Sequence, residues 1–165
     1  MIKGVLLLIG EITNQEVELI NLYAKLSITG RRELKEYLNY LLAKQYKKEV
    51  MNSVFNNKLM QNILHNLMYI VEKDDFDILQ VTRRIIQIKE LYYNVFGQVH
   101  LTYAELIPDL DSNEIVREFG LNSFENLNSA LLTEDHNKIR YEVINFHQEF
   151  IRLSKKKDAR QIAAV

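Results

Sequence analysis

The sequence predicts an all-α protein, folded as a single bundle of six to eight helices. Three observations support this class. Apolar residues recur at spacings of three and four along most of the chain, which is the period of a helix buried on one face. The 165 residues include only one proline and five glycines, so the usual breakers between strands are scarce. A chain of this length also buries enough surface to fold without disulfides, and it contains no cysteine.

We expect one domain over residues 1–165. Its expected parts are N-terminal helices in 1–72, a long central helix in 75–97, short helices in 101–133 and a C-terminal helix in 134–160.

The N-terminal part begins with an apolar run at residues 5–9, which is too short for a secretory signal and is expected to belong to the core. Thr13 and Glu16 then have the spacing of a capping box, in which each side chain hydrogen-bonds a free backbone amide of the first helical turn. A helix is expected to follow and to break at residues 27–30. Its inward side chains are expected to be Val17, Ile20, Tyr23 and Leu26.

Two more helices complete the N-terminal part. The first is expected from Arg31 to Val50 or beyond, and the second from about residue 58 to residue 72. The apolar residues of the first are Leu34, Tyr37, Leu38, Leu41 and Leu42. Those of the second are Met60, Ile63, Leu64, Leu67, Met68 and Val71.

The long central helix has the most regular apolar face and is expected to be the most buried element. Its main positions are Ile78, Val81, Ile85, Ile88, Tyr92, Val95 and Val99, and the residues that widen this face are Leu79, Ile86 and Phe96. Asp74 and Asp75 are the expected N-caps, because carboxylates bind the free amides at a helix start. Gly97 is the expected stop.

Residues 101–133 are predicted to form short helices. Pro108 interrupts the pattern, and Asp111 and Glu114 have the spacing of a second capping box. Gly120 is expected to end a brief helix and Ser123 to cap another.

A C-terminal helix is predicted from about residue 138 to residue 160. Its inward positions are Ile139, Val143, Phe146, Phe150 and Leu153.

Residues 16–48 read EVELINLYAKLSITGRRELKEYLNYLLAKQYKK, with leucine-rich helices on both sides of the loop LSITGRR. This stretch resembles the dimerisation hairpin that follows the DNA-binding domain in many phage-repressor-like bacterial regulators. The resemblance implies self-association through one leucine surface. Its residues would be Leu19, Leu22, Leu34, Leu38 and Leu41. The alternative is that these leucines fill the core of the monomer.

Residues 113–132, NEIVREFGLNSFENLNSALL, are similar to the helix-turn-helix units of arabinose-type regulators in their apolar positions and turn glycine. However, the helix that would read DNA has no Arg or Lys, and residues 101–140 hold eight acidic residues against three basic ones. Because phosphate contacts supply most non-specific affinity for DNA, this local charge of -5 would repel it. No specific DNA binding is expected.

Enzymatic chemistry has little support. The motifs of metalloproteases, di-iron bundles, P-loops, dinucleotide-binding folds and nucleophile elbows do not occur, and the four histidines stand apart at His65, His100, His136 and His147. We expect no catalytic residue, no metal site and no cofactor.

We therefore expect a non-enzymatic regulatory or interaction protein, of bacterial or phage origin, that acts in the cytoplasm by binding protein and forms a homodimer or other homo-oligomer. No apolar run reaches the roughly 20 residues that a bilayer requires. Besides the leucine surface, the exposed candidates for partner binding are Tyr40, Tyr93, Lys155, Lys156 and Lys157. Two alternatives stay open. One is a ligand-sensing helical domain, globin-like and free of haem, with an apolar pocket. The other is an immunity or inhibitor protein that binds a basic partner.

Overall fold

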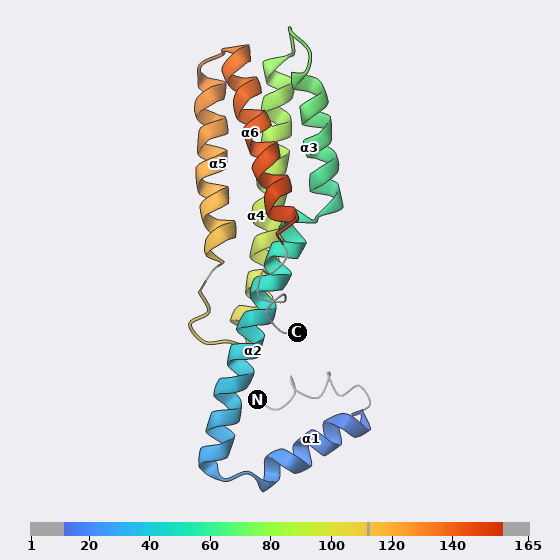
Figure 1. The fold of residues 1–165 in the computed structure, drawn as a ribbon, viewed down its shortest axis with the longest axis vertical. Helices are drawn as coiled ribbons and strands as arrows, with labels where there is room; N and C mark the ends of the chain where they lie inside the picture. The colour runs from blue at the N-terminus through green and yellow to red at the C-terminus, as the bar shows by residue number, and fades with distance from the viewer. Residues whose placement is uncertain (1–11, 112, 157–165) are drawn as a thin grey trace, which may run out of the picture. The chain divides into compact units, whose positions relative to one another are not determined.

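The computed structural model describes residues 12–111 and 113–156, and in these residues every regular element is a helix (Figure 1). The all-α class is therefore confirmed for this part of the chain. The helices are α1 (Asn14–Lys25), α2 (Ile28–Phe55), α3 (Lys58–Val71), α4 (Ile78–Ala104), α5 (Glu114–Leu132) and α6 (His136–Ser154). The apolar run predicted to be core at residues 5–9 lies outside the described residues.

Contacts divide the chain into two compact units, whereas the sequence predicts one domain. Unit 1 is Met1–Leu41 and unit 2 is Leu42–Val165. The division falls inside α2, so the first half of this helix belongs to unit 1 and the second half to unit 2. The two units differ in their cores, because the buried side chains of the described residues all lie in unit 2.

Unit 2 contains an antiparallel four-helix bundle made of α3, α4, α5 and α6. Each of these helices packs against the next one in the chain, and α6 closes the ring against α3. The helices run alternately up and down (Figure 1), as in bundles with short connections. The second half of α2 adds buried side chains to this core, namely Tyr46, Val50, Val54 and Phe55.

Aromatic rings fill the middle of the bundle. Phe55 of α2 lies 5.1 to 6.3 Å, between ring centroids, from Tyr92, Phe119 and Phe150. Phe146 lies 5.3 Å from Phe119 in the same way. The predicted inward positions of the C-terminal helix, Ile139, Val143, Phe146, Phe150 and Leu153, are all buried, which confirms that prediction.

Helix α4 begins three residues later than predicted. The N-cap is Asp77, whose carboxylate accepts a hydrogen bond of 2.9 Å from the amide of Leu79, and not Asp74 or Asp75. The reason lies in the preceding turn, where the guanidinium of Arg140 donates to the carbonyl oxygens that end α3. Its Nε and one terminal nitrogen reach Val71 O at 2.7 Å and Lys73 O at 2.9 Å.

The predicted face of α4 is buried only in part. Val81, Ile85, Ile88 and Tyr92 are buried, together with Tyr103 near the end of the helix. Leu79 and Ile86, predicted to widen this face, are exposed instead. Helices α3 and α5 pack against α4, and the second half of α2 contacts it through Tyr46 and Phe55.

Gly97 does not end α4, contrary to the prediction, and the helix continues to Ala104. Two contacts of the extra turns explain this result. Tyr103 is buried, and the ring of His100 hydrogen-bonds the hydroxyl of Tyr46. A glycine inside a helix costs about 1 kcal/mol relative to alanine, which the burial of one tyrosine offsets.

Gly120 and Ser123 were expected to separate two short helices, but α5 runs through both. Gly120 is buried, and a Cβ atom at this position would lie 2.8 Å from Cε1 of Tyr92. The hydroxyl of Tyr92 also donates a hydrogen bond to the carbonyl of Val116. Gly120 therefore permits the close approach of α4 and α5, and it does not terminate a helix.

The start of α5 and both ends of α6 also differ from the predictions. Helix α5 is capped by Asn113, whose side chain accepts from the amide of Val116 at 3.0 Å, rather than by Asp111 in a capping box with Glu114. Helix α6 begins after its N-cap Asp135 and ends at Ser154, well before the predicted residue 160.

In unit 1, the predicted capping box at the start of α1 is confirmed. The amide of Thr13 donates to the Glu16 carboxylate at 2.6 Å, and the amide of Glu16 donates to the Thr13 hydroxyl at 3.3 Å. The break after α1 is shorter than expected, because α2 resumes at Ile28. The Ser27 hydroxyl accepts from the amide of Gly30 at 3.1 Å and so satisfies the first turn of α2.

None of the helices in the described part of the chain has the length and apolar character needed to cross a bilayer.

Candidate functional site

The candidate site is an apolar surface on unit 1. No residue of α1 is buried, and the first half of α2 adds further exposed apolar side chains. The unit 1 apolar surface consists of Ile12, Val17, Leu19, Ile20, Leu22, Tyr23, Leu26, Ile28, Tyr37, Leu38, Tyr40 and Leu41. Apolar side chains exposed in such number on two neighbouring helices make this part of unit 1 a candidate binding site, since large apolar patches are rare on monomers.

The five leucines predicted for self-association all lie in unit 1. Leu19, Leu22, Leu38 and Leu41 are exposed, with Leu22 at 60% exposure, and Leu34 is half-buried.

The α1 side chains that were predicted to face inward are exposed instead, because no other described element of unit 1 covers them. These are Val17, Ile20, Tyr23 and Leu26.

The turn between α1 and α2 is held by Arg31. Its guanidinium donates to the carbonyl oxygens of Tyr23 and Ala24 at 3.3 and 3.1 Å, at the C-terminal end of α1. The same guanidinium lies over the ring of Tyr23, 5.0 Å from the ring centroid. One cation thus fixes the end of α1 and the start of α2.

The two tyrosines predicted to bind partners lie in different units. Tyr40 is exposed on α2 and stacks on Tyr37, with ring centroids 6.4 Å apart. Tyr93 lies on α4, where its ring contacts Tyr92 and Phe124 and only about a third of the residue is exposed. Tyr40 is therefore the freer of the two aromatic side chains.

Of the three C-terminal lysines, Lys155 and Lys156 follow α6 and are exposed. Lys157 lies outside the described residues.

A polar junction joins α2, α4 and the start of α5 in unit 2. The Tyr46 hydroxyl is 2.8 Å from Nδ1 of His100 and accepts from the backbone amide of Asn113 at 3.3 Å. Beside it, the Tyr103 hydroxyl donates to Glu49. The junction anchors the N-cap of α5 to α2.

The tyrosines of this junction stay protonated at neutral pH. Burial raises the pKa of Tyr46, and the hydrogen bond to the Glu49 carboxylate raises the pKa of Tyr103. A phenol that keeps its proton is a hydrogen-bond donor and not a base.

The histidines do not form one cluster. His136 is 3.0 Å from the carbonyl of Phe76, and His100 belongs to the polar junction. The pKa of His147 is lowered by burial and, to a smaller extent, by the charge of His65. Among the described residues no group of three or more His, Asp or Glu side chains could hold a metal ion.

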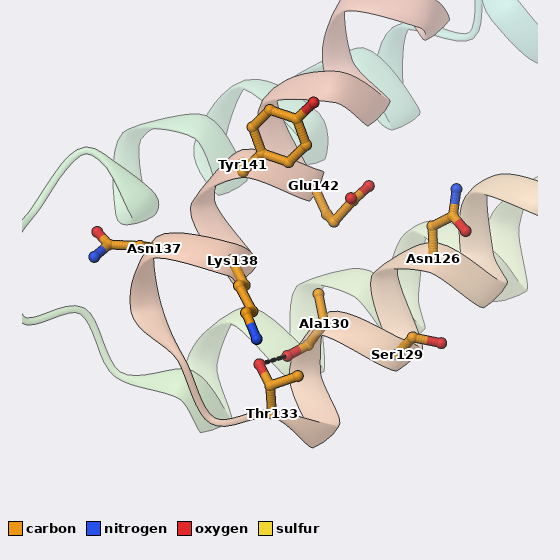
Figure 2. A pocket seen from close by; sticks show the side chains of 8 residues that line it. All are labelled: Asn126, Ser129, Ala130, Thr133, Asn137, Lys138, Tyr141 and Glu142. Atoms are coloured by element: carbon orange, nitrogen blue, oxygen red, sulfur yellow. Dashed lines mark hydrogen bonds between the residues drawn. The ribbon is translucent and has the colours of Figure 1, made fainter.

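A groove of about 440 Å³ runs between α5 and α6 (Figure 2). Figure 2 shows the Glu142 carboxylate between Tyr141 and Asn126, and the Thr133 hydroxyl donating to the carbonyl of Ala130 at 2.6 Å. The small side chain of Ala130 at the junction of the two helices leaves this space open. The lining offers one amine and one carboxylate among neutral groups, so it selects no class of ligand.

Comparison with protein-family models, with curated proteins and with solved structures finds no match for this chain. The resemblance to regulator hairpins therefore stays a prediction.

The sequence did not predict two of these features, the groove and the polar junction. Nothing in the helical spacing marks Ala130 or Glu142, because small and polar residues are common on exposed helix faces. The hydrogen bond between Tyr46 and His100 joins residues 54 positions apart, and neither residue belongs to a recognisable motif. By contrast, the leucines of unit 1 could be singled out in the sequence, because their helices have more apolar positions than one small bundle needs.

Proposed function

We propose that this chain is a non-enzymatic regulatory or interaction protein that acts by binding protein and that self-associates through the unit 1 apolar surface. The resemblance to phage-repressor-like regulators extends this proposal to a protein of bacterial or phage origin.

The exposure of α1 is the observation that supports the proposal best. An isolated helix of 12 residues is marginal in water, and most helices in proteins are stabilised by packing of an apolar face. Yet every described side chain of α1 is exposed. A helix in this situation gains its packing from another molecule.

The size of the surface suits a stable complex. At the usual size of such side chains, the unit 1 apolar surface exposes on the order of 1,000 Å². A standard protein–protein interface buries about 800 Å² per partner. Stacked exposed tyrosines such as Tyr37 and Tyr40 are also typical of interfaces, since their rings lose little entropy on binding.

Light scattering after gel filtration tests self-association. We expect a particle of at least twice the 19.5 kDa of one chain at micromolar concentration. Leu38→Glu places a charge in the surface and should shift the particle to one chain, while circular dichroism keeps the helical signal of unit 2.

The matched control is Leu132→Glu on α5. Leu132 is 78% exposed but lies in unit 2, outside the unit 1 apolar surface, so this charge should leave the mass unchanged. A mass of 19.5 kDa for the unmodified chain over the whole micromolar range would remove self-association from the proposal.

The second candidate function, an inhibitor that binds a basic protein, is supported by the local charge of -5 in residues 101–140 of unit 2. The acidic side chains at the end of α4, in the following loop and along α5 are exposed, so they are available to a basic protein. They are Glu105, Asp109, Asp111, Glu114, Glu118 and Glu125. An inhibitor of this kind should bind a basic protein with an association rate that falls steeply with salt. Stopped-flow mixing at 20 and 200 mM salt measures this rate, and no salt dependence would exclude the candidate.

A further inference from the structure

The first half of α2 carries an apolar face that ends at the boundary between the units. Leu34, Leu38 and Leu41 are spaced by four and three residues, so they lie on one side of the helix. The next positions on that side are Gln45 and Lys48, and both are exposed polar residues. This face therefore does not continue into the core of unit 2.

The buried face of the second half of α2 lies on a different side. Tyr46, Val50 and Val54 are fully buried and follow one another at four-residue spacing. Traced back toward the N-terminus, the same side carries Asn39 and Glu36, which are polar. At about 100° per residue, the two apolar faces of α2 lie roughly half a turn apart. The leucine face consequently needs a neighbour of its own.

Helix α1 has apolar side chains around more than half of its circumference. One flank consists of Val17, Ile20 and Ala24, the other of Leu19, Leu22 and Leu26, and Tyr23 lies between them. Two helices that pack as a simple pair need only a narrow seam. The wide apolar arc of α1 fits a helix with two neighbours, as in a four-helix arrangement.

Among the described residues of unit 1, no other element covers α1. The pairs of helices that pack closely are formed among α3, α4, α5 and α6, and α1 belongs to none of them. Within unit 1, α1 and the first half of α2 extend in different directions from the turn between them (Figure 1). Folding α1 back along α2 would also place Lys25 beside Arg32, which carries the same charge.

The charges of unit 1 favour a second copy of this chain as the neighbour. Residues 12–41 contain four acidic and four basic side chains, so a partner of one charge sign gains nothing overall. The acidic residues of α1 lie at its start, at Glu16 and Glu18, and basic residues lie at the start of α2, at Arg31 and Arg32. A parallel pairing of α1 with the first half of α2 brings these opposite charges together.

We infer that two chains exchange their α1 helices, so that α1 of each copy packs, in parallel, against residues 28–41 of the other copy. This inference rests on the proposed self-association and specifies its geometry. The contact is isologous, because each copy gives one α1 and receives one. It covers the leucine face of α2 and one flank of α1 in both chains.

Cysteine cross-linking tests the geometry, since the natural chain has no cysteine. Gln15→Cys lies near the start of α1, Thr29→Cys near the start of α2, and Tyr40→Cys near the end of unit 1; all three positions are exposed. Single-cysteine variants are mixed in pairs, exchanged to equilibrium and treated with a short bismaleimide. Parallel exchange predicts about five-fold more two-chain product for Gln15→Cys with Thr29→Cys than for Gln15→Cys with Tyr40→Cys.

A charge-reversal pair provides an independent measurement. Glu18→Arg alone and Arg32→Glu alone should each weaken self-association about ten-fold, and mixing the two variants should restore it to within about three-fold of the natural chain. Particles of two chains with equal or inverted cross-linking yields would overturn the exchange while leaving self-association in place. Particles of one chain would overturn both.

Discussion

Units 1 and 2 have the same kind of sequence, but only unit 2 has buried side chains among the described residues. Both consist of capped helices with apolar residues at spacings of three and four. In unit 2 these residues interlock around Phe55 and Tyr92, whereas in unit 1 they remain exposed. Helical periodicity therefore predicts that a face will be buried, but not whether the covering surface belongs to the same chain.

The largest effect should come from a matched pair on α4. Ile85 is 6% exposed and its neighbour Ile86 is 49% exposed. Ile85→Ala should lower the free energy of unfolding by about 2 to 5 kcal/mol through lost burial and a cavity, and Ile86→Ala by less than about 1 kcal/mol. Urea unfolding followed by circular dichroism measures both.

The same experiment extends to unit 1 with Ile20→Ala. Because Ile20 is exposed in the single chain, its loss should leave the urea midpoint of unit 2 unchanged and should weaken self-association. A shift of that midpoint as large as the shift for Ile85→Ala would mean that the two units do not differ as described.

Two glycines provide a second comparison, with effects of opposite sign. Gly120→Ala should cost about 1 to 3 kcal/mol, because the new Cβ would meet the ring of Tyr92 at 2.8 Å. Gly97→Ala should instead stabilise α4 by about 0.5 to 1 kcal/mol, since no atom lies within 4 Å of the new Cβ. Thermal unfolding of the two variants shows the signs directly, and destabilisation by Gly97→Ala would contradict the open surroundings found there.

As the pH falls, unit 2 should lose stability before the capping box of α1 in unit 1 does. Burial lowers the pKa of His147 from its ordinary 6.5, so its contribution to stability is present above pH 6.5 and is lost as the pH falls through the folded value. Hydrogen bonds from Thr13 lower the pKa of Glu16 from 4.5, so the cap of α1 weakens only at lower pH. Between pH 7 and pH 5 the urea midpoint of unit 2 should fall, and His147→Gln should reduce this fall. An equal fall with His147→Gln would assign the acid sensitivity to other groups.

The smallest effect that we expect is binding to duplex DNA, which should be weak. Residues 12–41 carry no net charge and residues 101–140 carry -5. Affinity should be independent of sequence and lost between about 50 and 200 mM salt, as for phosphate contacts alone. Fluorescence anisotropy at 150 mM salt measures it, with Lys155→Glu to locate any contact. Nanomolar, sequence-selective binding at that salt would contradict the prediction.

The sequence predicted the fold class and many of the buried positions of α3, α4 and α6, because regular spacing over long helices is a strong signal. It wrongly placed helix ends at Gly97 and Gly120, through which α4 and α5 continue. A glycine in sequence looks the same whether it stops a helix or, as with Gly120, admits a tyrosine from a neighbouring helix. That distinction depends on residue 92, which is 28 positions away, and spacing within one helix contains no information about it.

The candidate site was predicted in part. Leu19, Leu22, Leu34, Leu38 and Leu41 were predicted either to form a self-association surface or to fill the core, and four of them are exposed, while Val17 and the rest of the inward set were assigned to a core. The reason is that the spacing of apolar residues is the same in a helix whose apolar face is buried and in a helix, such as α1, whose apolar side chains are exposed.

The order of packing in unit 2 has a consequence for folding rates. Helices that follow one another in the chain are neighbours in the bundle, and α3 with α6 is the pairing that joins its ends. Bundles with such local contacts fold in about microseconds to milliseconds. Two chains at micromolar concentration meet, at typical rate constants, only about 0.1 to 10 times per second. Unit 2 is thus expected to fold long before the chain meets a second copy, so the self-association proposed above would follow the folding of unit 2.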